Sequence, residues 1–177
     1  MALNKYGHFI SISPVAYKIN FHINIFEWRV IFQMNNTTYS AKINEIERKW
    51  YIIDASNKPI GKVAAQAALI LRGKHKPTYT PNLDTGDHVI ILNCKDAILT
   101  GKKLDQKIYR HHSSYVGGMK ETTARVMMNN NPEKAMMLAV KGMLPKNSLG
   151  RQMLRKVRIY SGSEHENQAQ KPEIWNF

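Results

Sequence analysis

Two short apolar runs separated by an amphipathic stretch restrict the possible folds of this chain more than any other feature of its sequence. The runs cover residues 50–54 and 88–93 and are continuous, which is typical of strands that are buried on both faces. The stretch between them carries apolar residues at helical spacing, at Ile60, Val63, Ala64, Ala67 and Leu71. Strand, helix and strand in this order predict a βαβ unit with a parallel sheet.

The ends of the predicted helix carry recognisable signals. Residues 56–59 have the composition of a turn, and Pro59 suits the first helical turn because its missing N–H is not needed there. Gly73 follows the last apolar position and predicts the helix end.

The second half of the domain has weaker patterns. Residues 97–100 and 107–109 are predicted as strands joined by an exposed turn at 101–103, and Gly117 and Gly118 break the chain again. Residues 122–128 are predicted as a short helix.

Two more helices are expected after that. One starts at Asn131 and Pro132 and places Met136, Val140 and Met143 on one face. The other covers residues 149–156, with Asn147 or Ser148 as its cap. Residues 157–160 are predicted as a strand, and the polar tail from residue 161 is expected to extend over the surface.

The chain carries twice as many basic as acidic side chains. Lys and Arg number 26 against 13 Asp and Glu in 177 residues, which gives a net charge of +13 and a pI near 9.9. Such an excess repels itself in a small domain, and a polyanionic partner is the usual reason to keep it. Nucleic acid is the first candidate partner and an anionic membrane surface the second, while a third interpretation is that the charge serves only solubility.

The basic residues are most concentrated between residues 141 and 158. This window contains no Asp or Glu and six cations, namely Lys141, Lys146, Arg151, Arg155, Lys156 and Arg158. On the predicted helix, Leu149 and Met153 share one face and Arg151 and Arg155 the opposite one. One face can therefore pack on the core while the other offers guanidinium groups, which bind phosphate through two hydrogen bonds at once.

Further basic clusters follow turns. They comprise Arg72, Lys74, His75 and Lys76, then Lys102 and Lys103, then Arg110, His111 and His112, with Lys120 and His165 completing the predicted RNA-binding set. Tyr109 and Tyr115 lie beside the third cluster, and basic residues interleaved with aromatic ones can pair phosphates and stack on unpaired bases. Clusters on several sides of a domain favour embedding in a folded RNA over gripping one groove.

Signatures of enzymes and metal sites are missing from the pattern. Gly61 is the single glycine between residues 54 and 63. Neither the glycine-rich dinucleotide fingerprint nor a P-loop is therefore present there. Asp84 and Asp87 flank a Thr-Gly turn and are interpreted as turn caps, not as an acid–base pair. Adjacent His111 and His112 point to opposite faces of a strand and cannot readily share one ion. We therefore expect no catalytic residue, metal or cofactor, and no small-molecule substrate.

The single cysteine and the hydropathy pattern bear on the compartment. Cys94 allows no disulfide within the chain, fits a reducing cytoplasmic compartment and is expected to be a buried thiol. No stretch approaches the ~18 consecutive apolar residues of a membrane span.

Two other functions remain as alternatives, a generic RNA- or DNA-binding module and a nucleotide-binding enzyme of the doubly wound type.

Four segments give the chain a family resemblance between about residues 48 and 172. They are the runs at 50–55, at 71–81, at 84–93, and at 140–145 with its continuations at 149–151 and 157–162. In these segments the chain resembles the bacterial large-subunit ribosomal protein thirteen family, and Val140-Lys141-Gly142-Met143-Leu144-Pro145 is the most specific match. The tail around Glu164-His165 and 169–172 is also similar.

The resemblance implies a three-layer α/β/α domain with a four-stranded, mainly parallel sheet, plus basic loops and a C-terminal tail. It also implies a structural role in the large (50S) subunit, with 23S rRNA and neighbouring large-subunit proteins as partners of a monomer within the ribosome. Support of early subunit assembly belongs to the same expectation.

Residues 1–33 depart from this family pattern. They are rich in Ile, Phe, Asn and Tyr and do not resemble a secretory signal. We interpret the chain as an extension at 1–33, an N-terminal segment at 34–47, the α/β domain at 48–160 and a tail at 161–177. The hypothesis is that Met34 is the natural start and that the extension is not part of the native protein or is poorly ordered.

Intact-mass measurement of the native protein tests this hypothesis. We expect a polypeptide that begins at Met34 and has a net charge of +11, because the extension holds three basic residues and one acidic residue. A mass that includes residues 1–33 would rule out this start.

Overall fold

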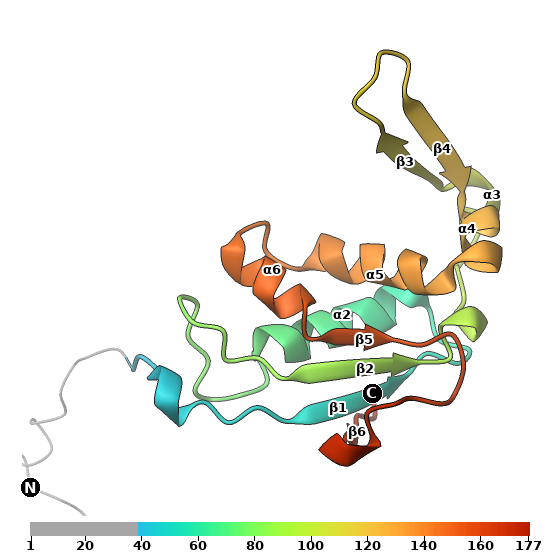
Figure 1. Cartoon of the computed structure of the whole chain (residues 1–177). Coiled ribbons are helices and arrows are strands. Elements are labelled where there is room, and N and C mark those ends of the chain that lie inside the picture. The colour runs from blue at the N-terminus through green and yellow to red at the C-terminus, as the bar shows by residue number, and fades with distance from the viewer. Residues whose placement is uncertain (1–38) are drawn as a thin grey trace, which may run out of the picture. The chain divides into compact units, whose positions relative to one another are not determined.

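A parallel sheet of four short strands forms the centre of residues 39–177, the part of the chain that the computed structural model describes (Figure 1). Its strands are β1 (Trp50–Asp54), β2 (His88–Leu92), β5 (Val157–Ile159) and β6 (Glu173–Ile174), and their spatial order is β5-β2-β1-β6. All three neighbouring pairs are parallel. The predicted four-stranded parallel sheet is thus confirmed, while the predicted extension at 1–33 lies outside the described residues.

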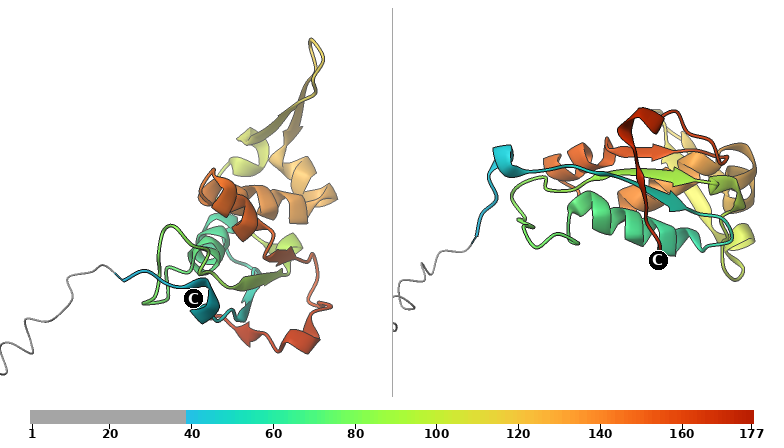
Figure 2. Two further views of the ribbon diagram at one scale, coloured as in Figure 1. Left: turned by 60° about the vertical axis from the view of Figure 1, so that its left-hand side comes forward. Right: turned by 90° about the horizontal axis from the view of Figure 1, so that it is seen from below.

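Helices flank this sheet and make the fold a three-layer α/β arrangement, as predicted. Helix α2 (Ile60–Arg72) packs against one face, and α5 (Pro132–Met143) lies beside α2 and β5 (Figure 1). On the other side of the sheet runs the C-terminal segment with its 3-10 helix η3 (Gln168–Gln170), as the view from below shows (Figure 2). Helix α6 (Ser148–Leu154) connects α5 to β5.

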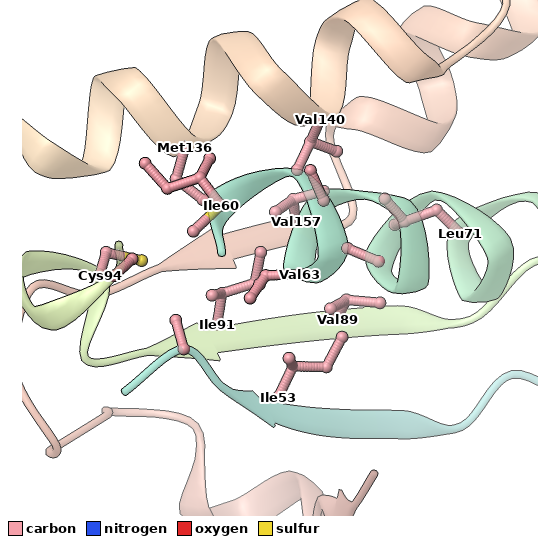
Figure 3. Close-up of a cluster of buried hydrophobic side chains, with 14 of the residues drawn as sticks. Ile53, Ile60, Val63, Leu71, Val89, Ile91, Cys94, Met136, Val140 and Val157 are labelled. Carbon is pink, nitrogen blue, oxygen red and sulfur yellow. The ribbon is translucent and has the colours of Figure 1, made fainter. Parts of the chain in front are cut away.

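The alternation of side chains along the strands places the core between the sheet and the helices. Ile53, Val89 and Ile91 point from β1 and β2 toward Val63 of α2 and are completely buried (Figure 3). Ile90, on the opposite face of β2, is also completely buried. Because both faces of β2 are covered, its sequence is continuously apolar, and each such buried side chain stabilises the fold by about 1.5–3 kcal/mol.

The βαβ unit has the predicted boundaries. Pro59 immediately precedes α2, and Gly73 ends it in the left-handed region at φ 78°, where its N–H reaches the carbonyls of Leu69 and Ile70. Cys94 is fully buried as expected, and burial raises the pKa of its thiol to about 12.

The structure corrects the predictions for residues 97–123. The predicted strand at 97–100 is only a single bridge from Ile98 to Pro59. The turn at Gly101 exists, but Lys103 already begins the short helix α3 (Lys103–Gln106). The strand predicted at 107–109 is the first part of β3 (Ile108–His112), which pairs antiparallel with β4 (Met119–Thr123). Sequence patterns missed this hairpin because both of its faces are largely exposed, so no apolar alternation marks it.

The helix predicted at 122–128 is α4 (Ala124–Asn130), which starts two residues later because Thr122 and Thr123 end β4. In α5, Met136 and Val140 are buried as predicted, but Met143 is 44% exposed and lies off the buried face. Helix α6 is shorter than predicted, and its cap is Asn147, whose Oδ1 accepts the N–H of Gly150 at 2.8 Å.

The tail does more than extend over the surface. Its strand β6 pairs with β1, and Trp175 packs edge-on against Tyr51 with ring centroids 5.2 Å apart. Lys58 lies 4.0 Å from the centre of the Phe177 ring. The sheet edge at β1 is therefore covered by residues far away in sequence. At the other end of the described chain, the N-terminal segment holds one 3-10 turn, η1 (Ile43–Glu45).

Residues 73–87 fold back tightly onto the end of α2. The N–H of Asp87 donates to the carbonyl of Ile70 at 3.2 Å, and a Cβ atom on Gly86 would lie 1.7 Å from the carbonyl oxygen of Leu71. Only glycine fits at position 86, because the obstacle is backbone and cannot rotate away.

Replacement of Gly86 by Ala should therefore lower the free energy of unfolding by at least about 1–3 kcal/mol, the usual cost of overpacking. Gly61→Ala is the matched control, since a Cβ at Gly61 meets no atom within 4 Å. It should be neutral or stabilise α2 by up to about 1 kcal/mol. Urea unfolding measures the free energy of unfolding of both variants. Equal changes in the two variants would contradict the close packing around Gly86.

Candidate nucleic-acid interface

The basic window of the sequence forms an exposed surface at one end of the domain. Lys141 lies in the last turn of α5, Lys146 precedes α6, Arg151 lies on α6, Arg155 follows α6 and Arg158 lies on β5. All five side chains are exposed, while Met153 is only 3% exposed and points into the core. The two opposite faces predicted for this helix are confirmed. We call these five residues the C-terminal basic surface.

Two open hollows indent the C-terminal basic surface. One, of about 730 Å³, is bordered by Arg151, Arg155 and Arg158 together with apolar residues. The second, of about 500 Å³, lies between the end of α5 and α6 and is bordered by Lys141, Lys146 and Arg151. Among the residues that line either hollow there is no Asp or Glu. An anion in either hollow would thus meet several positive groups and no repelling carboxylate.

A hairpin arm made of β3 and β4 stands away from the sheet, joined to it through α3 and α4 (Figures 1 and 2). His111, His112 and Lys120 are exposed on the arm. Arg110 is exposed too, but its Nε donates to Glu121 across the hairpin at 2.7 Å, and this partner raises the pKa of Arg110. The arm therefore offers a second, separate group of basic side chains.

The tip of the arm is closed by its own backbone. The N–H of Ser113 donates to the carbonyl of Gly118 at 3.0 Å, and the N–H of Gly118 donates to the carbonyl of Tyr115, also at 3.0 Å. Tyr115 is 81% exposed, whereas Tyr109 is half-buried. Of the two aromatic rings predicted near this cluster, Tyr115 is the one displayed to a partner.

Other predicted residues turn inward and are held by a buried carboxylate. Asp87 is completely buried, and its two oxygens lie 2.6 Å from Nζ of Lys76 and 2.9 Å from Nε2 of His75. It also accepts the backbone N–H of Lys49 at 2.8 Å, while Lys76 donates to the carbonyl of Glu47 at 2.7 Å. The charge of Lys76 is thus used within the protein and is not displayed to a partner.

Lys156 is held in the same way by Asp84. Its Nζ donates to Oδ1 of Asp84 at 2.6 Å and to the carbonyl of Gly86 at 2.8 Å, and both side chains are about nine-tenths buried. Burial lowers the pKa of Lys156, and the neighbouring Asp84 carboxylate partly offsets this. The interpretation of Asp84 and Asp87 as simple turn caps is therefore too narrow. Asp84 does accept the N–H of Gly86, at 3.4 Å, but its main partner is Lys156, 72 positions away, and Asp87 binds Lys76 of the same loop.

The remaining residues of the predicted RNA-binding set are exposed or half-buried. Lys74, Lys102 and Lys103 are exposed, and Arg72 is half-buried with its guanidinium 6.0 Å from the centre of the Tyr79 ring. His165 is half-buried, and its Nδ1 accepts the N–H of Asn167 at 3.2 Å.

Sequence reasoning missed the exposed Lys107, which directly precedes β3, although its position between Lys103 and Arg110 could have suggested it. It also missed the apolar residues that line the hollows, because nothing local distinguishes them from core residues. Within residues 39–177 no three His, Cys, Asp or Glu side chains could hold a metal ion together. In the same range no helix is both long and apolar enough to span a bilayer.

Comparison with known proteins identifies the family of this chain. Residues 48–166, more than half of the chain, match the family described as Ribosomal protein L13. The chain belongs to the ribosomal protein L13 family, which is structural and not enzymatic.

Individual relatives agree with the family match. The large ribosomal subunit protein uL13 of Desulfitobacterium hafniense (strain DSM 10664 / DCB-2) is 60% identical over 141 residues, which is 80% of this chain and 99% of the relative. That of Ruminiclostridium cellulolyticum is 61% identical over 137 residues, 77% of this chain and 95% of the relative. The resemblance found in the sequence segments is confirmed.

The inward and outward cations should behave differently on replacement. Lys156→Met leaves the Asp84 carboxylate buried without its partner, and removal of one member of a buried pair typically costs about 3–5 kcal/mol of stability. The adjacent exposed residue supplies the control, and Arg155→Met should change stability by less than about 0.5 kcal/mol. Thermal and urea unfolding measure both effects. A Lys156→Met protein as stable as the control would show that the ion pair does not hold this region.

Proposed function

We propose that this chain is a structural constituent of the large (50S) ribosomal subunit, binds 23S rRNA and supports early subunit assembly. It acts as a monomer within the cytoplasmic ribosome, beside other large-subunit proteins, and needs no cofactor. Its family supports the ribosomal role, and the relatives that it matches are named as proteins of the large ribosomal subunit.

The observation that carries the RNA-binding proposal is the C-terminal basic surface. Its five exposed cations surround two hollows that no carboxylate lines. A surface that serves only solubility mixes both signs of charge, because a field of one sign repels itself. A field of one sign, with arginine forks among its donors, suits a closely packed set of phosphates.

The mechanism that follows is electrostatic. Each cation that contacts a phosphate releases condensed counterions, so affinity falls steeply with salt. The arm carries further exposed cations away from the sheet, and Lys74 lies in the loop after α2. Contacts on separate sides of one domain lower the repulsion between RNA segments that approach one another, and this is how the protein would favour assembly.

The proposed RNA-binding set is therefore the exposed part of the predicted one. Lys76 and Lys156 serve the fold, because their ammonium groups are held by buried carboxylates. A generic nucleic-acid-binding role outside the ribosome is the alternative. Co-sedimentation of the native chain with large subunits at high salt separates the two, since a generic binder would be released.

Simultaneous replacement of Arg151, Arg155 and Arg158 by Ala should weaken binding to deproteinised 23S rRNA. The slope of log affinity against log salt should become shallower by about 2 to 3, at 0.7 to 0.9 for each lost phosphate contact. The fold should remain intact, because all three side chains are exposed.

The matched control removes three exposed cations from elsewhere on the domain, namely Lys42, Lys62 and Lys95. This variant has the same net charge as the triple arginine variant, so a purely global charge effect would weaken both equally. Equal losses, or unchanged binding of the arginine variant at physiological salt, would reject the C-terminal basic surface as the RNA contact.

A further inference from the structure

The hollow between the end of α5 and α6 is lined by apolar side chains as well as by cations. Leu138, Leu144 and Leu154 contribute the apolar part, and Leu138 is 37% exposed. Lys141, Lys146 and Arg151 border the same space with exposed side chains. A surface that only neutralised phosphates would need the cations and not the leucines.

The backbone around this hollow is fixed before any ligand arrives. A Cβ on Gly150 would lie 1.8 Å from the carbonyl oxygen of Pro145, so the turn from α5 into α6 is closed as tightly as glycine permits. Asn147 caps α6 from within this turn by accepting the N–H of Gly150. At Gly142, by contrast, a Cβ would meet no atom within 4 Å, so the hollow stays open on that side.

Duplex RNA does not complement such a site. It presents phosphates, sugars and a shallow minor groove, while the flat apolar faces of its bases are stacked inside. An unpaired base can leave the stack and cover an apolar surface while the phosphates on either side of it meet cations. We infer that this hollow binds an unstacked nucleobase of a single-stranded RNA segment, with Lys141, Lys146 and Arg151 contacting the phosphates that flank it.

This inference rests on the proposed RNA-binding function and adds the kind of RNA that the surface selects. The positive charge around the hollow favours RNA over a protein as the occupant. The hollow has three cations and no carboxylate on its border. A protein that docked its apolar side chains there would also have to supply several acidic groups, whereas every nucleotide brings its own phosphate.

The test compares two RNA probes on the full chain with isotope-labelled leucine methyl groups. One probe is a short single-stranded RNA, and the other is a blunt duplex with the same number of phosphates. With the single strand, we expect upfield shifts of the Leu138 and Leu154 methyl resonances, because a base ring lies over them. With the duplex, those resonances should stay in place even where the duplex binds the chain through its phosphates.

Affinity of variants provides the second measurement. Leu138→Ala should weaken binding of the single strand about fivefold, as expected for losing part of one aliphatic contact, and should leave its salt dependence unchanged. Ala is a strong helix former and Leu138 is exposed, so α5 should tolerate the change. Val126→Ala is the control, because Val126 is 46% exposed on α4 and lines neither hollow. It should bind both probes like the parent chain.

The outcomes separate this inference from the function on which it rests. If both probes bind equally and the leucine resonances remain silent, the surface reads phosphates only, and the inference is overturned while RNA binding stands. If the leucine resonances respond to large-subunit proteins and not to RNA, the occupant is a protein and the inference is again overturned. If neither probe nor deproteinised 23S rRNA binds, the proposed function falls and takes the inference with it.

Discussion

Two buried carboxylates fix how the connection between α2 and β2 meets the neighbouring parts of the domain. Asp84 and Asp87 lie in the connection between α2 and β2, and each is held by a lysine ammonium group 2.6 Å away. A buried carboxylate without a partner is strongly unfavourable, so the Lys156–Asp84 pair fixes the connection against the start of β5. The N-terminal segment is attached to the same connection by the N–H of Lys49, which donates to Asp87, and by the Glu47 carbonyl, which accepts from Lys76. Gly86, between them, allows the chain to touch the end of α2. The crossover of the βαβ unit is thereby tied to the start of β5, beside Arg155 and Arg158 of the C-terminal basic surface.

The same interactions divide the cations of the chain into two groups. Lys76 and Lys156 are directed inward, where their charge stabilises the fold. Arg155 and Arg158, neighbours of Lys156 in the sequence, are exposed beside a hollow. Membership of the ribosomal protein L13 family gives this division a physical meaning. The ion pairs of Lys76 and Lys156 stabilise the fold, while the C-terminal basic surface keeps its cations exposed for the partner proposed above.

The sequence predicted some elements of the fold well and others poorly. The βαβ unit was predicted almost to the residue, because strand and helix periodicities are local and both faces of β2 demand apolar side chains. Of the hairpin arm only the beginning of β3 was predicted, and β4 was missed, since an exposed ribbon carries no apolar alternation. The strand β6 was missed for a different reason. It has only two residues, and it exists because the edge of β1 offers unpaired backbone groups to the returning tail.

For the candidate site, the sequence by itself determined that a basic, acid-free segment lies on a helix with one apolar and one cationic face. It also predicted the family, through the four segments between residues 48 and 172 that carry the resemblance. Only the tertiary structure decided which cations are exposed, because the partner of Lys156 is 72 positions away in the chain. It alone brought the end of α5 and α6 together around an apolar hollow. Local periodicity reports on a side chain's own element, whereas ion pairing and concavity depend on which distant elements meet.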